Sequence, residues 1–230
     1  MSSGFQTTEG IILQVIPYGE YDQILIVFTP DRGVIKLFFK ASRSKRRGVQ
    51  GLCAPLTHIE IVYSERNSEL FSCREIKLID SYHYLRAKLV FLEVACDLLQ
   101  IVSQSQLVCK PAPLLYELLH FYLKKIPHIP DAWALSLSFR LKLLKHEGLV
   151  TIPFRCSECQ TPIVKESYLN DTEWYCELHR KSTFQFWEED ELYLLYHLSL
   201  CQNYRQLALC SISAALGEKT KTYFQLHFRH

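Results

Sequence analysis

Four residues of metal-binding type lie at two short, matching spacings. Cys156 and Cys159 are separated by two residues, and Cys176 and His179 repeat that spacing after an intervening loop. Two residues between ligands let one tight turn direct both side chains at a single ion, and two such turns about 15–20 residues apart complete a tetrahedron. Thiolate and imidazole ligands favour zinc over magnesium or calcium. The spacing therefore predicts a zinc site, and two unrelated residue pairs are the alternative.

The number of ligands indicates what this zinc would do. A catalytic zinc keeps an open position for water, whereas four protein ligands close the coordination sphere. Zinc deaminases place a glutamate general acid near a histidine ligand, but Glu177 lies inside a ligand turn, where we expect its side chain to point away from the ion. The sequence thus predicts a structural zinc in the segment 152–182 that stabilises the fold directly. Because Lys165 is the one basic residue between the turns, a scaffold is favoured over a nucleic-acid reader.

A second group of residues is purely basic. Residues 40–47 hold five positive charges and no acidic residue, and Lys36 precedes them on an expected strand beside Phe38 and Phe39. Clustered lysine and arginine neutralise phosphates and release counterions, and an aromatic ring on a barrel face can stack a base. This combination favours binding of single-stranded nucleic acid, with a solvated surface loop as the alternative.

The basic segment lies within a region of predicted β-structure. Apolar segments at 9–16, 22–29, 34–40, 56–63 and 69–78 are separated by turn signals such as Pro30-Asp31-Arg32-Gly33. In the fourth segment Ile59, Ile61 and Tyr63 fall on one side of the expected strand, and the other side carries His58, Glu60 and Val62. Short strands at this density predict a small five-stranded barrel of the oligonucleotide-binding (OB) type.

The metal-binding segment lies within a region of predicted helices. From Ser81 onward, apolar residues recur at helical spacing. The first expected helix carries Leu85, Leu89, Leu92, Cys96, Leu99 and Val102, and the second carries Leu114, Leu115, Leu118, Leu119 and Tyr122. Asp131 is the expected N-cap of a third helix, and two more are expected at 188–201 and 204–216. The fold class is thus α+β, with an OB barrel domain at 1–80 and a helical domain at 81–230 that contains an inserted zinc finger.

The composition and the missing motifs limit the classes of protein. Hydrophobic residues make up 48% of the chain and the formal net charge is +2, with no signal pattern or bilayer-length apolar run. We expect a cytoplasmic protein with no membrane partner, and no enzyme, because phosphate-loop, H-E-x-x-H and G-x-S-x-G motifs do not occur. Cysteines outside the metal site are expected to be buried thiols: Cys53, Cys73, Cys96, Cys109, Cys201 and Cys210.

Taken together, these segments resemble the RecO family of bacterial recombination mediators. The resemblance rests on residues 8–13, 18–25 and 28–33, on the lysine-small-small-basic element at 40–43 with Leu52 and Pro55 after it, and on 139–148, which leads into the cysteine turns. It covers the chain from about residue 8 to about residue 228. One departure is His179, since many members of that family carry a fourth cysteine there.

The resemblance implies a function in RecF-pathway DNA repair without catalysis. It implies binding to single- and double-stranded DNA, annealing of complementary strands and help in loading recombinase, in association with the nucleoid. The implied partners are RecR and the C-terminal tail of single-strand-binding protein, whose site on the helical domain is not assigned. By matching position, the candidate DNA contacts are Lys36, Lys40, Arg43, Lys45, Arg46 and Arg47. The alternative is a zinc-stabilised protein-interaction platform that does not bind DNA directly.

Overall fold

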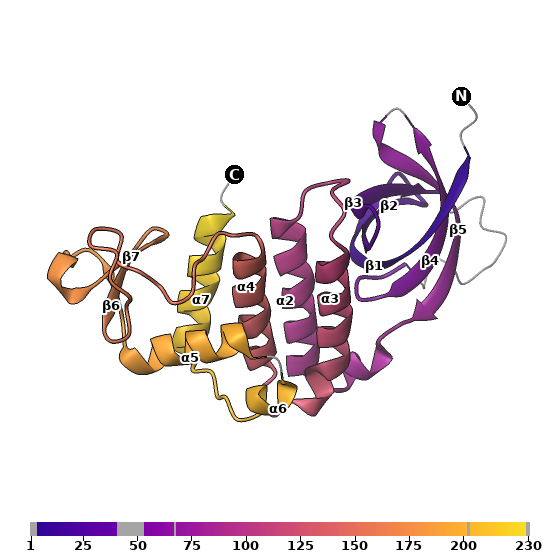
Figure 1. The fold of residues 1–230 in the computed structure, drawn as a ribbon. Coiled ribbons are helices and arrows are strands. Elements are labelled where there is room, and N and C mark those ends of the chain that lie inside the picture. Colours follow the sequence, from indigo (N-terminus) through magenta and orange to yellow (C-terminus); the bar gives the residue numbers. More distant parts are fainter. Residues whose placement is uncertain (1–3, 41–52, 67, 202, 229–230) are drawn as a thin grey trace. The chain divides into compact units, whose positions relative to one another are not determined.

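The fold was analysed in a computed structural model that describes residues 4–40, 53–66, 68–201 and 203–228. The chain divides into two compact units, Met1–Pro127 and His128–His230, and Figure 1 shows the order of their elements. The sequence predicts a domain boundary after residue 80, where strands give way to helices. The two compact units are defined by contacts between residues instead, so the boundary at residue 80 stays a prediction. Within the described ranges no helix combines the length and the apolar character needed to cross a bilayer.

The first unit contains a closed five-stranded barrel, which confirms the predicted OB fold. Its strands are β1 (Phe5–Tyr18), β2 (Asp22–Thr29), β3 (Gly33–Phe39), β4 (His58–Arg66) and β5 (Ser68–Asp80). They pair in the order β1-β2-β3-β5-β4, and the long β1 closes the ring by pairing with β4 through its first half and with β2 through its second. β3 and β5 run parallel, and the other neighbours are antiparallel.

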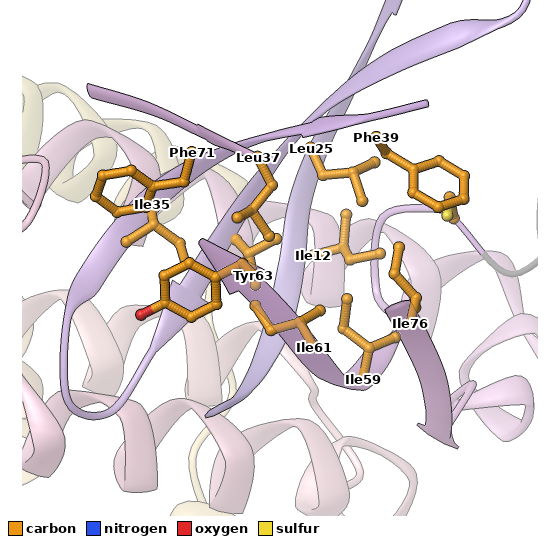
Figure 2. Close-up of a cluster of buried hydrophobic side chains, with 12 residues drawn as sticks. Ile12, Leu25, Ile35, Leu37, Phe39, Ile59, Ile61, Tyr63, Phe71 and Ile76 are labelled. Carbon is orange, nitrogen blue, oxygen red and sulfur yellow. The ribbon is translucent and has the colours of Figure 1, made fainter. Parts of the chain in front are cut away.

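Side chains from all five strands fill the barrel interior (Figure 2). The predicted alternation on β4 is confirmed, because Ile59, Ile61 and Tyr63 all point into this core. Full burial of one large aliphatic side chain contributes about 1.5–3 kcal/mol, so the interior supplies much of the stability of the unit. The buried cluster consists of Ile12, Leu25, Val27, Ile35, Leu37, Phe39, Cys53, Ile59, Ile61, Tyr63, Phe71 and Ile76.

Helical elements complete the first unit: η2 (His83–Ala87), α2 (Leu89–Ser105) and α3 (Pro113–Lys125). The short helix η3 (Ile126–His128) spans the boundary to the second unit. The expected burial of Cys96 is wrong, since its side chain is exposed. Two leucines of the predicted helical spacing, Leu89 and Leu114, are exposed as well. Lys88 has an extended backbone and separates η2, which contains Leu85, from α2, which begins at Leu89. The helical spacing of buried residues therefore does not continue from η2 into α2. The buried face of α2 consists of Val94, Ala95, Leu98, Leu99, Ile101 and Val102. Cys109 is also exposed, against expectation.

The loop between α2 and α3 attaches to the turn between β2 and β3. The backbone N–H of Cys109 donates to the carbonyl oxygen of Val34 at 2.9 Å, and Val108 forms a parallel bridge with Val34. This approach requires Gly33, whose φ is +63° and whose absent Cβ would lie 1.9 Å from the carbonyl oxygen of Lys110. Glycine adopts that conformation without the penalty of a side chain.

A buried polar cluster joins the barrel to α3. The Nε2 atom of His58, a residue only 6% exposed, lies 3.1 Å from the hydroxyl of Tyr116 and 3.3 Å from the Glu9 carboxylate. Next to it, the hydroxyl of Tyr82 lies 2.6 Å from Nδ1 of His120, and the His58 and His120 rings are 5.1 Å apart. Burial lowers the pKa of His58 and that of His120 below their usual values. Both imidazoles are therefore neutral partners in this cluster at neutral pH.

The second unit combines helices with a small sheet. Its helices are α4 (Trp133–His146), α5 (Glu189–Leu200), α6 (Tyr204–Leu207) and α7 (Ala214–His227), and its strands are β6 (Ser167–Asn170), β7 (Glu173–Tyr175) and β8 (Gln185–Trp187), in the order β7-β6-β8. α4 packs against α5 and α7. The residue directly before α4 is Ala132 rather than the expected Asp131, but the Asp131 carboxylate accepts the N–H of Trp133 at 3.0 Å from one position earlier.

The last two helices differ from the prediction of one helix over 204–216. α6 ends at Leu207, and α7 begins after Ser213, whose side chain accepts the N–H of Leu216. A serine at this position favours a new helix start over continuation of the previous helix. The C-terminal helix then runs on to His227.

Replacement of Gly33 should destabilise the first unit. For Gly33→Ala we expect a loss of about 2–4 kcal/mol of unfolding free energy, since the left-handed backbone alone costs about 1–2 kcal/mol and the new Cβ must displace the Lys110 backbone. Gly19→Ala is a matched control, because Gly19 has φ +65° but open space around its Cβ position. Urea unfolding measures both changes, and equal losses would contradict the requirement for close approach.

The histidine cluster should make stability fall in mild acid. An unfolded histidine takes up a proton near its ordinary pKa of about 6.5, whereas His58 and His120 resist protonation in the fold because burial lowers their pKa values. The unfolded state therefore binds more protons as the pH drops below about 6.5. We expect the unfolding midpoint to decrease between about pH 7 and about pH 5, and to decrease less in His120→Gln. A calorimetric pH series with identical slopes for the two proteins would contradict this.

Candidate metal centre and basic surface

The four predicted ligands come together in the second unit. Their ligand atoms all lie within 4.8 Å of one another. The Nδ1 atom of His179 is 3.5 Å from Sγ of Cys156 and 3.3 Å from Sγ of Cys176, and the Sγ atoms of Cys159 and Cys176 are 3.8 Å apart. A tetrahedral zinc, with bonds of about 2.3 Å to sulfur and about 2.0–2.1 Å to nitrogen, sets sulfur atoms about 3.8 Å apart and sulfur about 3.5 Å from nitrogen. The cluster can therefore hold one metal ion.

Backbone hydrogen bonds shape the first ligand turn. The N–H of Cys156 donates to the carbonyl oxygen of Thr161 at 3.0 Å, and the N–H of Gln160 donates back to the carbonyl oxygen of Cys156 at 2.8 Å. Gln160 takes a left-handed conformation with φ 60°, which turns the chain sharply after Cys159. The N–H of Ser157 donates to the carbonyl oxygen of Trp174 on β7. This bond brings the first turn next to the strand that leads to the second.

The second ligand turn is the short helix η4 (Glu177–His179), in which the N–H of His179 donates to the carbonyl oxygen of Cys176. Glu177 is exposed, and its carboxylate lies 4.0 Å from the guanidinium of Arg180. This position agrees with the expectation that Glu177 does not serve the metal. Glu177 is therefore not placed as the glutamate general acid of a zinc deaminase is.

The thiols of the first turn are biased toward the metal-binding form. A hydrogen bond from the Thr161 hydroxyl lowers the pKa of Cys159 to about 7. Burial opposes ionisation of Cys156, but hydrogen bonds from backbone N–H groups outweigh it and lower the pKa of that thiol. Because metals bind the thiolate, both residues are prepared for coordination.

Aromatic side chains anchor the centre to the helices of its unit. Phe154 stacks on Trp174 with ring centroids 4.3 Å apart, and the indole N–H of Trp174 donates to the hydroxyl of Tyr223 on α7 at 3.0 Å. The hydroxyl of Tyr196 on α5 accepts the N–H of Phe154 at 3.1 Å. Most apolar residues of the loop between the two ligand turns are buried and form a small core, but Val164 is exposed.

The structure places part of the predicted basic surface. Lys36 lies on β3, where its ammonium group is 3.3 Å from the Glu69 carboxylate, and Lys40 is exposed just past the end of that strand. Phe38 is partly exposed between them, whereas Phe39 is buried in the barrel and cannot stack on a ligand. The other predicted contacts lie outside the described residues: Arg43, Lys45, Arg46 and Arg47.

Two side chains that contact these sites, those of Tyr18 and Thr161, were not predicted from the sequence. The ring of Tyr18 meets that of Phe38 edge-on at 5.5 Å, although Tyr18 lies in an expected turn. Thr161 contacts the metal cluster with its hydroxyl, which lies 3.0 Å from Sγ of Cys159. A hydroxyl residue two positions after a ligand, as Thr161 is, could have indicated a hydrogen bond to that ligand. The contact between Tyr18 and Phe38 depends on how the strands are aligned, which the sequence does not show.

Metal content should follow the four ligands. We expect the purified protein to hold about one zinc ion per chain, and Cys176→Ala to lose it together with part of its thermal stability, because metal binding is coupled to folding. Cys96→Ala is the matched control, since Cys96 is an exposed cysteine on α2. Elemental analysis and calorimetry test this, and a metal-free wild type of full stability would contradict it.

Comparisons with known proteins match both halves of the chain. The family described as recombination protein O N terminal matches residues 1–82, and the one described as recombination protein O C terminal matches residues 89–218. A protein of Anaeromyxobacter sp. (strain K) named DNA repair protein RecO is 26% identical over 155 residues, covering 67% of this chain and 61% of its own length. The protein of the same name from Chlamydia pneumoniae is 23% identical over 211 residues, covering 91% of this chain and 83% of its own. The matched segment thus spans less than two thirds of the Anaeromyxobacter protein.

Proposed function

The chain belongs to the recombination protein O (RecO) family, and from this membership we propose that it acts in DNA repair as a DNA-binding recombination mediator. The proposed activities are binding of single- and double-stranded DNA, annealing of complementary strands and help in loading recombinase, without catalysis. The observation that carries the proposal is the match of both family models to a chain whose first unit contains an OB barrel. This fold presents a strand face suited to oligonucleotides.

The outer face of β3 supports binding of a nucleic acid strand. Lys36, Phe38 and Lys40 alternate with the buried Leu37 and Phe39, so they project from the same side of the barrel. Positive charges spaced along a strand suit successive phosphates, and an aromatic ring between them can stack a base. The edge contact with Tyr18 fixes the orientation of the Phe38 ring.

The basic segment that follows β3 extends this surface in our proposal. Arg43, Lys45, Arg46 and Arg47 come directly after Lys40 in the sequence, so their chain starts at the end of the proposed strand face. Their charge supplies phosphate contacts that need no base sequence. The proposed role is therefore sequence-independent binding, which suits a protein that pairs any two complementary strands.

Zinc in the second unit has a structural role in this proposal. Four protein ligands leave no open position for a substrate, and the aromatic anchor to α5 and α7 connects the centre to its helices. The proposed partners are RecR and the C-terminal tail of single-strand-binding protein, in the cytoplasm and associated with the nucleoid. These partners follow from family membership alone.

One observation favours the second candidate, a zinc-stabilised platform for other proteins. Several basic side chains of the described barrel surface are already paired with acidic ones: Lys36 with Glu69, Arg32 with Glu65 and Lys77 with Glu60. A phosphate must compete with those carboxylates. Because exposed ion pairs contribute only about 0–1 kcal/mol, this competition weakens DNA binding without preventing it.

The strand face and the basic segment should contribute to DNA affinity in different ways. We expect Phe38→Ala to weaken binding of an oligothymidine strand about 5- to 150-fold. This range corresponds to the binding free energy of about 1–3 kcal/mol that stacking of one base on an aromatic ring contributes. We expect the triple variant Lys45→Ala, Arg46→Ala, Arg47→Ala to weaken binding. The slope of log affinity against log salt concentration should become less steep by about 0.7 per lost phosphate contact. Fluorescence anisotropy at several salt concentrations measures both.

The control for this experiment is Lys77→Ala, which removes an exposed lysine of β5 that is paired with Glu60. Its affinity should remain close to that of the wild type. Wild-type affinity in both test variants, or no detectable binding by the wild type at low salt, would favour the protein-interaction platform.

A further inference from the structure

Cys159 is the most exposed of the three cysteine ligands of the metal centre. Its side chain is exposed, whereas Cys156 is buried and Cys176 is partly buried. A thiolate in water is open to competing electrophiles and to metal exchange. The stability of the whole centre therefore depends on what holds this sulfur in place.

Thr161 contacts both ligands of the first turn. Its carbonyl oxygen accepts the N–H of Cys156 at 3.0 Å, and its hydroxyl oxygen lies 3.0 Å from Sγ of Cys159. A metal-bound thiolate carries no proton, so the hydroxyl must be the donor in the bond to Cys159. A β-branched residue has few side-chain rotamers, which keeps the hydroxyl directed at the sulfur.

We propose that Thr161 is a positioning residue of the metal centre, whose hydroxyl holds the Cys159 thiolate on the ion. The hydrogen bond orients the sulfur and draws electron density from it, which makes the thiolate less nucleophilic toward other reagents. Partners that hydrogen-bond a ligand commonly change metal affinity about 10- to 100-fold when they are removed. This role goes beyond the proposed DNA-repair function and rests only on the metal centre.

Two substitutions separate the hydroxyl from the rest of the side chain. Thr161→Val keeps the β-branched shape and the backbone bonds but removes the hydroxyl, and Thr161→Ser keeps the hydroxyl. Thr183→Val is the matched control, because Thr183 is an exposed threonine that follows the last ligand in the sequence and forms no hydrogen bond within the described residues. Circular dichroism of each full-length variant verifies folding.

The experiment measures zinc release and thiol reactivity in the zinc-loaded full chain. We expect Thr161→Val to release zinc to a chromogenic chelator about 10-fold faster than the wild type or more, and N-ethylmaleimide to modify its Cys159 faster by mass spectrometry. Thr161→Ser and Thr183→Val should remain near the wild-type rates. Wild-type rates in Thr161→Val, or equally fast release in Thr161→Ser, would overturn the role of the hydroxyl.

Failure of the metal centre itself gives a different result. A wild-type protein that retains no zinc after loading would overturn the centre and this proposal together, whatever its DNA affinity. Unchanged zinc release in Thr161→Val with a stoichiometric wild type would overturn the role of Thr161 alone. DNA binding is not part of either measurement, so loss of the proposed function would leave these results unaffected.

Discussion

The parallel pairing of β3 with β5 is the constraint on which the barrel and its outer surface depend. It joins the two ends of a chain of antiparallel neighbours and sets Leu37 beside Phe71 and Phe38 beside Ser72. In this register Leu37 and Phe71 enter the core, and Phe38 stays partly exposed. A slip by one residue would exchange the two faces of β3, burying the lysines and exposing the apolar residues. The basic and aromatic strand face is thus a consequence of how the core is packed.

Helix α3 is attached to this barrel by polar contacts as well as by packing. Tyr116 contacts His58, and His120 contacts Tyr82. The loop before α3 also forms a backbone hydrogen bond with the chain just after the turn between β2 and β3. Buried polar groups are costly unless each finds a partner, so these contacts define one arrangement of helix and barrel. A purely apolar contact would allow more alternatives.

The sequence predicted the elements whose signals are local. The strands followed from alternation such as that of Ile59, Ile61 and Tyr63, and the ligand set followed from the spacing of Cys156 and Cys159. Where the prediction was wrong, an interruption changed the helical phase: Lys88 breaks the pattern before α2, and the chain leaves the helix after Leu207. The contact of Tyr18 with Phe38 and the cluster around His58 join residues far apart in the chain, so no local pattern could reveal them.

The small sheet of the second unit depends on the metal cluster, because a bound ion restricts the conformations of the unfolded chain. Its strands β6, β7 and β8 contain 4, 3 and 3 residues, and folded units below about 40 residues usually need a metal, disulfides or oligomerisation to be stable. An ion bound to Cys156 and His179 acts as a reversible cross-link that closes the loop between them. Such closure removes conformations from the unfolded ensemble, as a disulfide does, and the gain grows only slowly with loop length. The segment between the ligands can therefore vary in length at little thermodynamic cost, while the ligand turns cannot.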